Sequence, residues 1–131
     1  MAKTFQLEII TPTQIFSEGQ VNYVRAESPD GQFGIMPHHT AATVALGIGE
    51  VKVVKDGKEY FYATTGGFAD IQPESVLLLL ETAELVSDID IDRAKESKKR
   101  AQDRLKDGKM DKARSRTAIA KAKNRLKVSH R

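Results

Sequence analysis

The sequence predicts an α+β protein in which a β-sandwich, residues 1–87, precedes an antiparallel two-helix hairpin, residues 88–131. Hydrophobic period, composition and charge all change near Ser87. Residues 1–87 carry 5 Lys and Arg against 11 Asp and Glu, whereas residues 88–131 carry 16 against 7, so the net charges are −6 and +9. A boundary that is visible in three properties at once indicates two structural units.

The first unit is predicted to contain about eight to ten short strands separated by turns. Phe5, Leu7 and Ile9 alternate with polar residues, which predicts a half-buried first strand. Asp56-Gly57 between two β-rich runs favours a type I′ hairpin, because both residues must adopt positive φ. The apolar run 75–82 predicts a fully buried central strand. Short strands at close spacing favour a sandwich or flattened barrel over a parallel sheet.

The second unit has a helical period and few large apolar side chains. Asp88 or Asp90 is suited to cap a first helix that extends to about Asp107, and Gly108 is its expected end. A second helix is expected over about 111–127. The seam between the helices is mostly Ala, so it buries little apolar area and stabilises the hairpin weakly. Because the many cations also repel one another, we predict a hairpin that can detach or unfold.

Composition and motifs exclude several classes of protein. No cysteine is present, which excludes disulfides and thiolate metal sites. The longest aliphatic run, Val76–Leu80, is far shorter than the roughly 20 residues that span a bilayer. The N-terminus lacks the apolar block of a signal peptide, so we expect a soluble chain. The sequence has neither Gly-x-Ser-x-Gly nor a Gly-x-x-x-x-Gly-Lys phosphate loop, and the isolated chain is not expected to be an enzyme.

The histidines offer the remaining metal-ligand chemistry. His38 and His39 are adjacent, so on an extended segment their side chains point to opposite faces. No third ligand is evident near them, and His130 lies close to the C-terminus. A polar surface loop is the better interpretation, and no metal site is expected.

Four stretches occur in the order typical of one known family. They are Glu8-Ile9-Ile10-Thr11-Pro12, Gly31-Gln32-Phe33-Gly34-Ile35-Met36-Pro37-His38-His39, Thr65-Gly66-Gly67-Phe68 and Asp88-Ile89-Asp90-Ile91-Asp92-Arg93-Ala94. With these stretches and its β-then-hairpin plan, the chain resembles the epsilon subunit of bacterial F-type (F1Fo) ATP synthases over nearly its whole length. One departure concerns the second stretch, where the family commonly has Gly-His-Ala-Pro-Leu after the Pro and this chain has His38-His39-Thr40-Ala41-Ala42.

The resemblance implies a ten-stranded β-sandwich that clamps the rotary gamma subunit and rests on the ring of c subunits. It implies no catalytic chemistry and no required cofactor, with ATP as a regulatory ligand. The hairpin is expected either to fold against the sandwich or to extend along gamma toward the alpha/beta head, where it blocks ATP hydrolysis. The complex is expected at the cytoplasmic side of the bacterial cell membrane, with this subunit peripheral to it.

The motif Ile89-Asp90-x-x-Arg93-Ala94 matches the one that binds ATP in many bacterial members of the family. Asp90 and Arg93 are three apart and share one face of the helix start. Bound ATP would hold the two helices together and favour the folded, non-inhibiting form. A helix cap at Asp90 with a surface ion pair to Arg93 explains the same residues without a ligand. The residues expected around ATP are Glu84, Ile89, Asp90, Arg93, Ala94, Arg100, Arg114, Lys121 and Arg125.

Two further contacts are expected on the sandwich. The loop Ile35-Met36-Pro37-His38 combines turn chemistry with apolar side chains and is the candidate for contact with the c ring. An exposed apolar patch elsewhere should mark the gamma contact, because a lone domain seldom leaves such a patch bare.

The basic tail is open to more than one interpretation. The resemblance implies contact with an acidic segment of the beta subunit. A nucleic-acid-binding or adaptor protein is the alternative, although the tail has no aromatic residue on which a base could stack. A solvated charged hairpin is the simplest interpretation, and the contact with the beta subunit is the one we favour.

Overall fold

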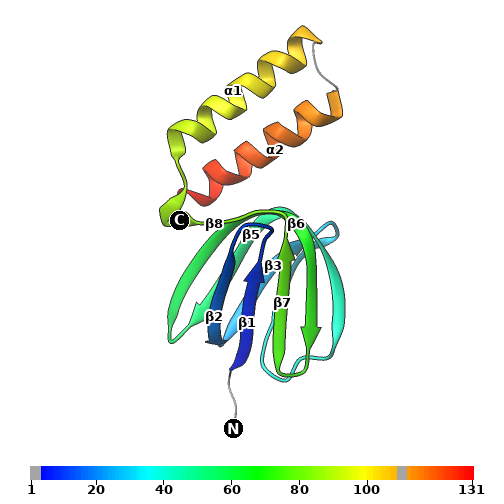
Figure 1. Cartoon of the computed structure of the whole chain (residues 1–131), viewed down its shortest axis with the longest axis vertical. Helices are drawn as coiled ribbons and strands as arrows, with labels where there is room; N and C mark the ends of the chain where they lie inside the picture. Colours follow the sequence, from blue (N-terminus) through cyan, green and yellow to red (C-terminus); the bar gives the residue numbers. More distant parts are fainter. Residues whose placement is uncertain (1–3, 109–111) are drawn as a thin grey trace. The chain divides into compact units, whose positions relative to one another are not determined.

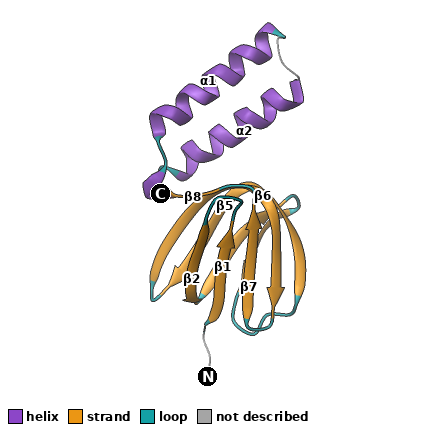
Figure 2. Ribbon diagram, viewed as in Figure 1, coloured by secondary structure: helices purple, strands orange, loops and turns teal. Residues whose placement is uncertain are grey.

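The computed structural model describes residues 4–108 and 112–131, without the side chain of Asp107. Two compact units follow one another along the chain, the first ending at Leu85 and the second beginning at Val86. Strands make up the first unit and helices the second (Figures 1 and 2). The predicted α+β class is therefore confirmed.

The first unit is one continuous sheet that folds over into a sandwich. Its described residues form eight strands in the order β2-β1-β7-β6-β5-β3-β4, with β8 paired to β6. β1 runs parallel to β7, and the other pairs are antiparallel. The strands are β1 (Phe5–Ile10), β2 (Ile15–Val21), β3 (Tyr23–Ser28), β4 (Gly31–Ile35), β5 (Ala42–Lys55), β6 (Lys58–Gln72), β7 (Ser75–Leu80) and β8 (Ala83–Leu85).

The two longest strands explain why the described residues form eight strands where ten were expected. β5 has 14 residues and β6 has 15, and their register skips a pair between Leu46↔Gly67 and Ile48↔Thr65. Gly66 and Gly67 have φ values of 110° and 146°, which side chains rarely allow. Each long strand therefore bends at its glycines and serves both layers: the first half of β6 pairs with β8 and its second half with β7.

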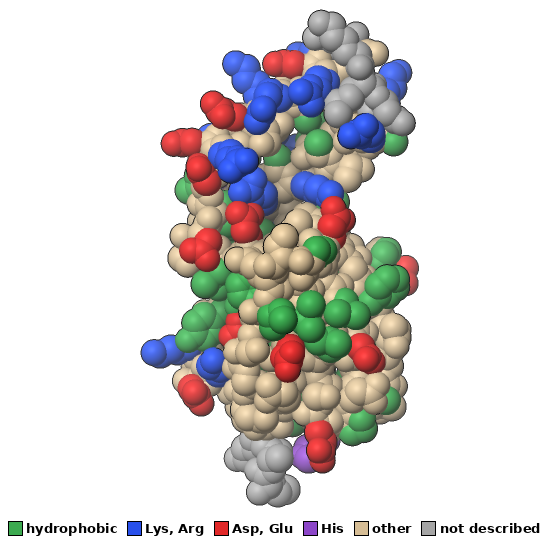
Figure 3. Space-filling view, viewed as in Figure 1, with side chains coloured by type: hydrophobic (Ala, Val, Ile, Leu, Met, Phe, Trp, Pro, Cys, Tyr) green, Lys and Arg blue, Asp and Glu red, His purple; other side chains and the backbone are tan. Residues whose placement is uncertain are grey.

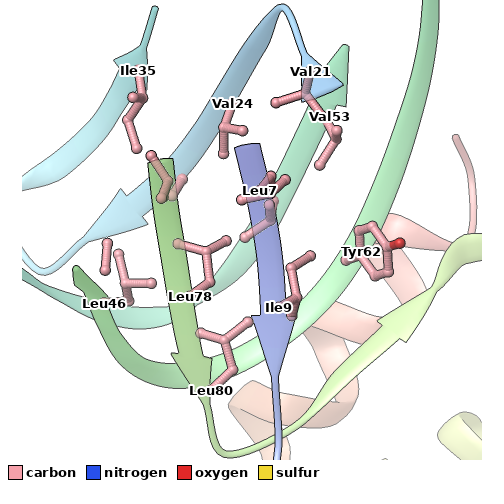
Figure 4. Packing of buried hydrophobic residues seen from close by; sticks show 14 of the residues in the cluster. Leu7, Ile9, Val21, Val24, Ile35, Leu46, Val53, Tyr62, Leu78 and Leu80 are labelled. Carbon is pink, nitrogen blue, oxygen red and sulfur yellow. The ribbon is translucent and has the colours of Figure 1, made fainter. Parts of the chain in front are cut away.

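Inward-facing residues of the bent sheet form the core (Figure 4). Phe5, Leu7 and Ile9 of β1 are each at most 1% exposed, which confirms the predicted alternation. The Asp56-Gly57 turn is also confirmed, with φ values of 53° and 78°. The core residues are Phe5, Leu7, Ile9, Val21, Val24, Ala26, Ile35, Leu46, Val51, Val53, Tyr62, Ala69, Ile71, Val76, Leu78, Leu80 and Ala83.

The prediction that residues 75–82 form a fully buried strand is wrong. Val76, Leu78 and Leu80 of β7 are buried. Leu79, which lies between Leu78 and Leu80, is 42% exposed. β7 lies between β1 and β6 in the sheet, so only one of its faces meets the core. A continuous apolar run here reflects an apolar outer surface rather than burial on both faces.

The second unit is a helical hairpin with the predicted ends. A short 3-10 turn, Val86–Asp88, precedes α1 (Ile91–Asp107), and α2 covers Lys112–Val128. Asp90 caps α1, because its Oδ1 accepts a hydrogen bond from Arg93 N at 3.0 Å. Gly108 ends α1 with φ 64°. The predicted start of the second helix at Asp111 lies outside the described residues.

Small residues form the seam between α1 and α2, as predicted. Ala94 and Ala101 of α1 are 0% and 5% exposed, and Ser115 and Ala122 of α2 are 0% and 3% exposed. Ala113, Thr117 and Ala120 of α2 are exposed, so these three residues face away from α1. A seam of Ala and Ser buries little apolar area, so it contributes only weakly to holding the helices together.

Candidate functional site

One flank of α1 carries two of the residues predicted to hold ATP. Arg93 and Arg100 are seven apart and each directly precedes a buried seam residue, Ala94 or Ala101. Successive residues of a helix are about 100° apart, so both guanidinium groups leave the helix beside the seam, on the same side. Both side chains are exposed.

α2 repeats this arrangement. Arg114 and Lys121 directly precede the buried Ser115 and Ala122, and Arg125 lies eleven residues after Arg114, on the same face. The two helices contact each other and run in opposite directions (Figure 1). In an antiparallel helix pair, the residues that directly precede a seam residue project on the same side of the hairpin from both helices. The hairpin therefore has a basic flank, made of Arg93, Arg100, Arg114, Lys121 and Arg125.

The opposite flank is also basic. Lys95, Arg116 and Lys123 each directly follow a seam residue and are exposed. Blue side chains spread accordingly over the hairpin in Figure 3. The basic flank is distinguished by its hollow, of about 390 Å³, which is lined by Ala113, Arg114, Thr117, Ala118 and Lys121.

Arg100 differs from the α2 members of the basic flank in what surrounds it. It lines a separate hollow of about 480 Å³ on α1, together with Glu96, Lys99 and Asp103. Two carboxylates beside this guanidinium make the surroundings less favourable for an anion than the hollow of Arg114 and Lys121. The structure thus brings Arg114 and Lys121 into one hollow and leaves Arg100 in another.

The start of α1 has the geometry of a helix cap. The Asp90 carboxylate is exposed and bonds to the backbone amide of Arg93. Among the described residues no ion pair joins the side chains of Asp90 and Arg93. Ile89 is 9% exposed and Ala94 is 0% exposed, so the side chains of these two motif residues are buried at the start of α1. Glu84 belongs to the first unit, where β8 pairs it with Ala63.

An apolar row crosses five strands on the outer face of the sandwich. The register pairs Ile15 with Ile10, Ile10 with Leu79, Leu79 with Phe68, and Phe68 with Ala45. Residues that are directly opposite project on the same face of a sheet. Ile15 is 68% exposed, Phe68 54% and Leu79 42%. Hydrophobic side chains gather on this face in Figure 3. We call these five residues the apolar row.

The sequence did not single out the residues of the apolar row. Ile15, Ile10 and Leu79 lie in runs that favour strands, and nothing local shows which face of each strand is covered. The unbroken Leu77–Leu80 run was the available signal, because a strand with one buried face should alternate.

The loop that is predicted to contact the c ring contains both exposed and buried residues. Met36 is 64% exposed and His38 is exposed, whereas Ile35 is 3% exposed and belongs to the core. His38 has φ 65°, the left-handed region that favours Gly. The described residues contain no group of three or more His, Asp or Glu placed to hold a metal ion. None of their helices is long and apolar enough to cross a membrane.

Comparison with known families assigns both units. Residues 4–86 match "ATP synthase, Delta/Epsilon chain, beta-sandwich domain", and residues 87–130 match "ATP synthase, Delta/Epsilon chain, long alpha-helix domain". The chain belongs to the delta/epsilon chain family of ATP synthases. As an epsilon-type chain it is a non-catalytic subunit of that complex, which confirms the expectation that it is no enzyme of its own.

Curated relatives align with this chain over almost its whole length. The ATP synthase epsilon chain of Desulforamulus reducens is 37% identical over 131 residues, which cover 98% of this chain and 99% of that one. The epsilon chain of Nitratidesulfovibrio vulgaris is 40% identical over 130 residues, which cover 98% and 97%. The resemblance stated from the four sequence stretches is therefore confirmed.

Two solved structures share the fold at low sequence identity. A chain in the cryo-EM structure of the Euglena gracilis mitochondrial ATP synthase, OSCP/F1/c-ring, has a TM-score of 0.74 at 17% identity, and the match covers 99% of this chain and 79% of that one. A chain in the Tetrahymena thermophila mitochondrial ATP synthase, central stalk/c-ring, has a TM-score of 0.65 at 12% identity, with coverages of 98% and 97%. Both similarities concern the fold alone.

Proposed function

We propose that this chain links the gamma subunit to the c ring of a rotary, proton-translocating ATP synthase, peripheral to the cytoplasmic side of the bacterial membrane. Its hairpin inhibits ATP hydrolysis in the alpha/beta head, and bound ATP stabilises the folded, non-inhibiting state. The observation that supports this proposal best is the pairing of two unlike units. A well-packed sandwich bears an exposed apolar row, and a weakly packed basic hairpin follows it.

The apolar row is the proposed contact with gamma. Ile15, Phe68 and Leu79 present large apolar side chains to solvent, which a soluble domain seldom does without a partner. The next outward positions are Glu8 and Asp70, which the register places on either side of Leu77. An apolar centre with charged residues at its edge is the usual anatomy of a protein interface.

The c ring is the proposed partner of the β4–β5 loop. Met36 and His38 project from this loop, while Ile35 anchors it in the core. A buried anchor next to exposed residues holds a contact loop in place at little entropic cost. Met36 is accordingly the residue of this loop with the most apolar surface to offer.

The basic flank is the proposed phosphate site of ATP. Arg114 and Lys121 share one hollow, and guanidinium and ammonium groups are the usual partners of phosphate oxygens. The hollow is lined by α2 alone, and in the antiparallel hairpin Arg93 at the start of α1 lies toward the Arg125 end of the basic flank. A nucleotide whose phosphates occupy the hollow and that extends along the flank toward Arg125 and Arg93 would touch both helices. Such a ligand would supply the cohesion that the small-residue seam lacks.

The expected result is that Arg114→Ala and Lys121→Ala each weaken ATP binding by roughly tenfold or more, because each removes a charge-assisted hydrogen bond. Arg116→Ala and Lys123→Ala are matched controls from the opposite flank, and they should change the affinity less than about twofold. Calorimetric titration of the full chain with ATP measures all four. Equal losses on both flanks would mean that ATP responds only to the net charge of the hairpin.

Asp90 requires a different substitution, because Asp90→Ala removes a helix cap as well as a charge. Asn caps a helix about as well as Asp, so Asp90→Asn isolates the role of the carboxylate in binding. If calorimetric titration of the unaltered chain with millimolar ATP gives no binding heat, Asp90 acts only as a helix cap. The hairpin would then need a trigger other than a nucleotide.

Inhibition by the hairpin predicts a difference between the full chain and a chain ending at Ser87. The full chain should lower the ATPase activity of the isolated alpha/beta/gamma head several-fold, whereas the shortened chain should bind gamma and leave the activity unchanged. The physical reason is that the contact with gamma and the inhibitory helices belong to separate units. Steady-state ATPase assays measure the inhibition by each chain, and gel filtration measures its binding to gamma. Equal inhibition by both chains would assign inhibition to the sandwich.

A further inference from the structure

Charge is divided unevenly between the two helices of the hairpin. Over 17 residues each, α1 has seven Lys and Arg with four Asp and Glu, whereas α2 has seven Lys and Arg and no acidic residue. Among the described residues, no ion pair is recorded for Lys112, Arg116, Lys123 or Lys127 of α2. α2 is therefore strongly cationic, with no counter-charge on the same helix.

The cations of α2 form two rows, one on each side of its outward face, which is the side away from α1. Ala113, Thr117 and Ala120 lie on this face and are exposed. Because the residues between the rows have short side chains, the longer cationic side chains of both rows can reach the same plane. The helical period of 3.6 residues defines the rows. One is Arg114, Lys121 and Arg125 of the basic flank, and the second row is Lys112, Arg116, Lys123 and Lys127.

The outward face of α1 has the opposite character. Asp92, Glu96 and Asp103 lie on the side of α1 away from α2, and all three are exposed. Red side chains accordingly line the edge of the hairpin that α1 forms in Figure 3. A negatively charged surface would attract the outward face of α2 and repel that of α1, so the hairpin has a preferred orientation toward such a surface.

The form of the cationic face indicates which kind of anion it suits. The two rows together extend from Lys112 to Lys127, which is about 22 Å at 1.5 Å per residue. A plane of negative charge meets both rows over this length, whereas a single small anion meets only a part of one row. The outward residues Ala113, Thr117 and Ala120 offer no aromatic ring for base stacking and no large apolar side chain to insert into hydrocarbon.

We propose that the outward face of α2 docks on the anionic headgroups of a lipid bilayer, with α1 facing away from it. The choice of a membrane over another anionic plane rests on the proposed peripheral position of this chain at the membrane. The contact is electrostatic and stays at the level of the headgroups, because the outward residues are too small to enter the acyl chains. It therefore requires anionic lipid and weakens as the salt concentration rises.

Sedimentation of sucrose-loaded vesicles with the full chain tests the docking. At about 0.1 M salt the chain should sediment with vesicles rich in phosphatidylglycerol and stay in solution with vesicles of phosphatidylcholine alone. Near 1 M salt it should leave the anionic vesicles, because charges are then screened beyond about 3 Å. A chain that does not bind the phosphatidylglycerol vesicles at the lower salt concentration would overturn the proposal.

Removing cations from the second row should weaken the docking. Arg116→Gln, Lys123→Gln and Lys127→Gln together should lower the affinity for phosphatidylglycerol vesicles by roughly 100-fold, at about fivefold for each cation. Gln is a good helix former, so α2 should keep its helix. None of the three positions is among the residues proposed to hold ATP, so the affinity for ATP should be nearly unchanged. Loss of docking is thus measured separately from the proposed nucleotide site.

The matched control removes the same charge from exposed positions of α1. Lys95→Gln, Lys99→Gln and Lys106→Gln together should lower the vesicle affinity by less than about threefold, because α1 lies about 8–10 Å further from the bilayer, where charges are screened. Equal losses from the two triple variants would mean that only net charge matters and would refute the docking face. Tighter binding to duplex DNA or to polyglutamate at the same salt would assign the face to a nucleic acid or an acidic protein instead.

Ala120→Glu decides the question if the triple variant of α2 loses its helical circular dichroism. It adds one carboxylate to the outward face, and Glu is a good helix former. It should weaken vesicle binding about fivefold or more, whereas Gln102→Glu, which adds the same charge to α1, should have less effect. An unchanged affinity with Ala120→Glu would exclude the docking. Because the vesicles contain no other subunit, these outcomes do not depend on the contacts proposed with gamma and the c ring.

Discussion

Replacing Phe68 with Glu should abolish stable association with gamma, with a loss of affinity of roughly 100-fold or more. Phe68 lies within the apolar row, between Leu79 and Ala45. Closing an interface over this position would bury an unpaired carboxylate, which costs several kcal/mol. The side chain is 54% exposed in the free chain, so the folded sandwich should tolerate the change. Co-expression with gamma followed by affinity purification and gel filtration measures the effect.

Lys58→Glu provides the matched control, because it also adds a carboxylate at an exposed position of β6. Lys58 lies at the β5–β6 turn, away from the apolar row in the register. It should leave association with gamma nearly unchanged. Leu79→Glu, in contrast, should repeat the loss seen at Phe68. If both apolar-row variants still associate with gamma and have normal unfolding curves, then another surface holds gamma.

Gly67→Ala should lower the free energy of unfolding by about 3 kcal/mol or more, the second large effect expected. Gly67 has φ 146°, and a Cβ built there would overlap the Leu79 backbone carbonyl. That carbonyl belongs to the paired strand β7, so it cannot move without breaking the ladder. Denaturant unfolding followed by circular dichroism measures the loss.

Gly57→Ala separates the backbone strain from the overlap. Gly57 also has a positive φ, 78°, but a Cβ there meets nothing within 4 Å. Its cost should be only about 1 kcal/mol, from the left-handed conformation alone. Similar losses at Gly57 and Gly67 would mean that β6 and β7 relax freely, and the bend at Gly67 would then not require a glycine.

Local chemistry determined the ends and turns of this protein. Asp90 and Gly108 mark the limits of α1 because capping needs only a side-chain oxygen or a positive φ at one position. Asp56-Gly57 marks its turn for the same reason. The residues expected around ATP came from the family resemblance and from their charge, and the helical period of α2 places three of them, Arg114, Lys121 and Arg125, on one face.

Tertiary structure decided the features that depend on which face of a strand is covered. The sequence predicted β7 to be fully buried, but Leu79 is outward-facing because none of the described residues of the unit covers that side of the sheet. The apolar row exists only once the register aligns Ile15, Ile10, Leu79, Phe68 and Ala45, which come from five strands.

The same holds for the strand count and for His39. Whether β5 and β6 are two long strands or four short ones depends on pairing across Gly66, which is a contact between distant segments. His39 read as a surface residue in the sequence, yet it bridges Met36 O and Gln72 O, which lie 36 residues apart. Local sequence sets conformational preferences, but hydrogen-bond partners that are far apart in the chain are chosen only by the packed fold.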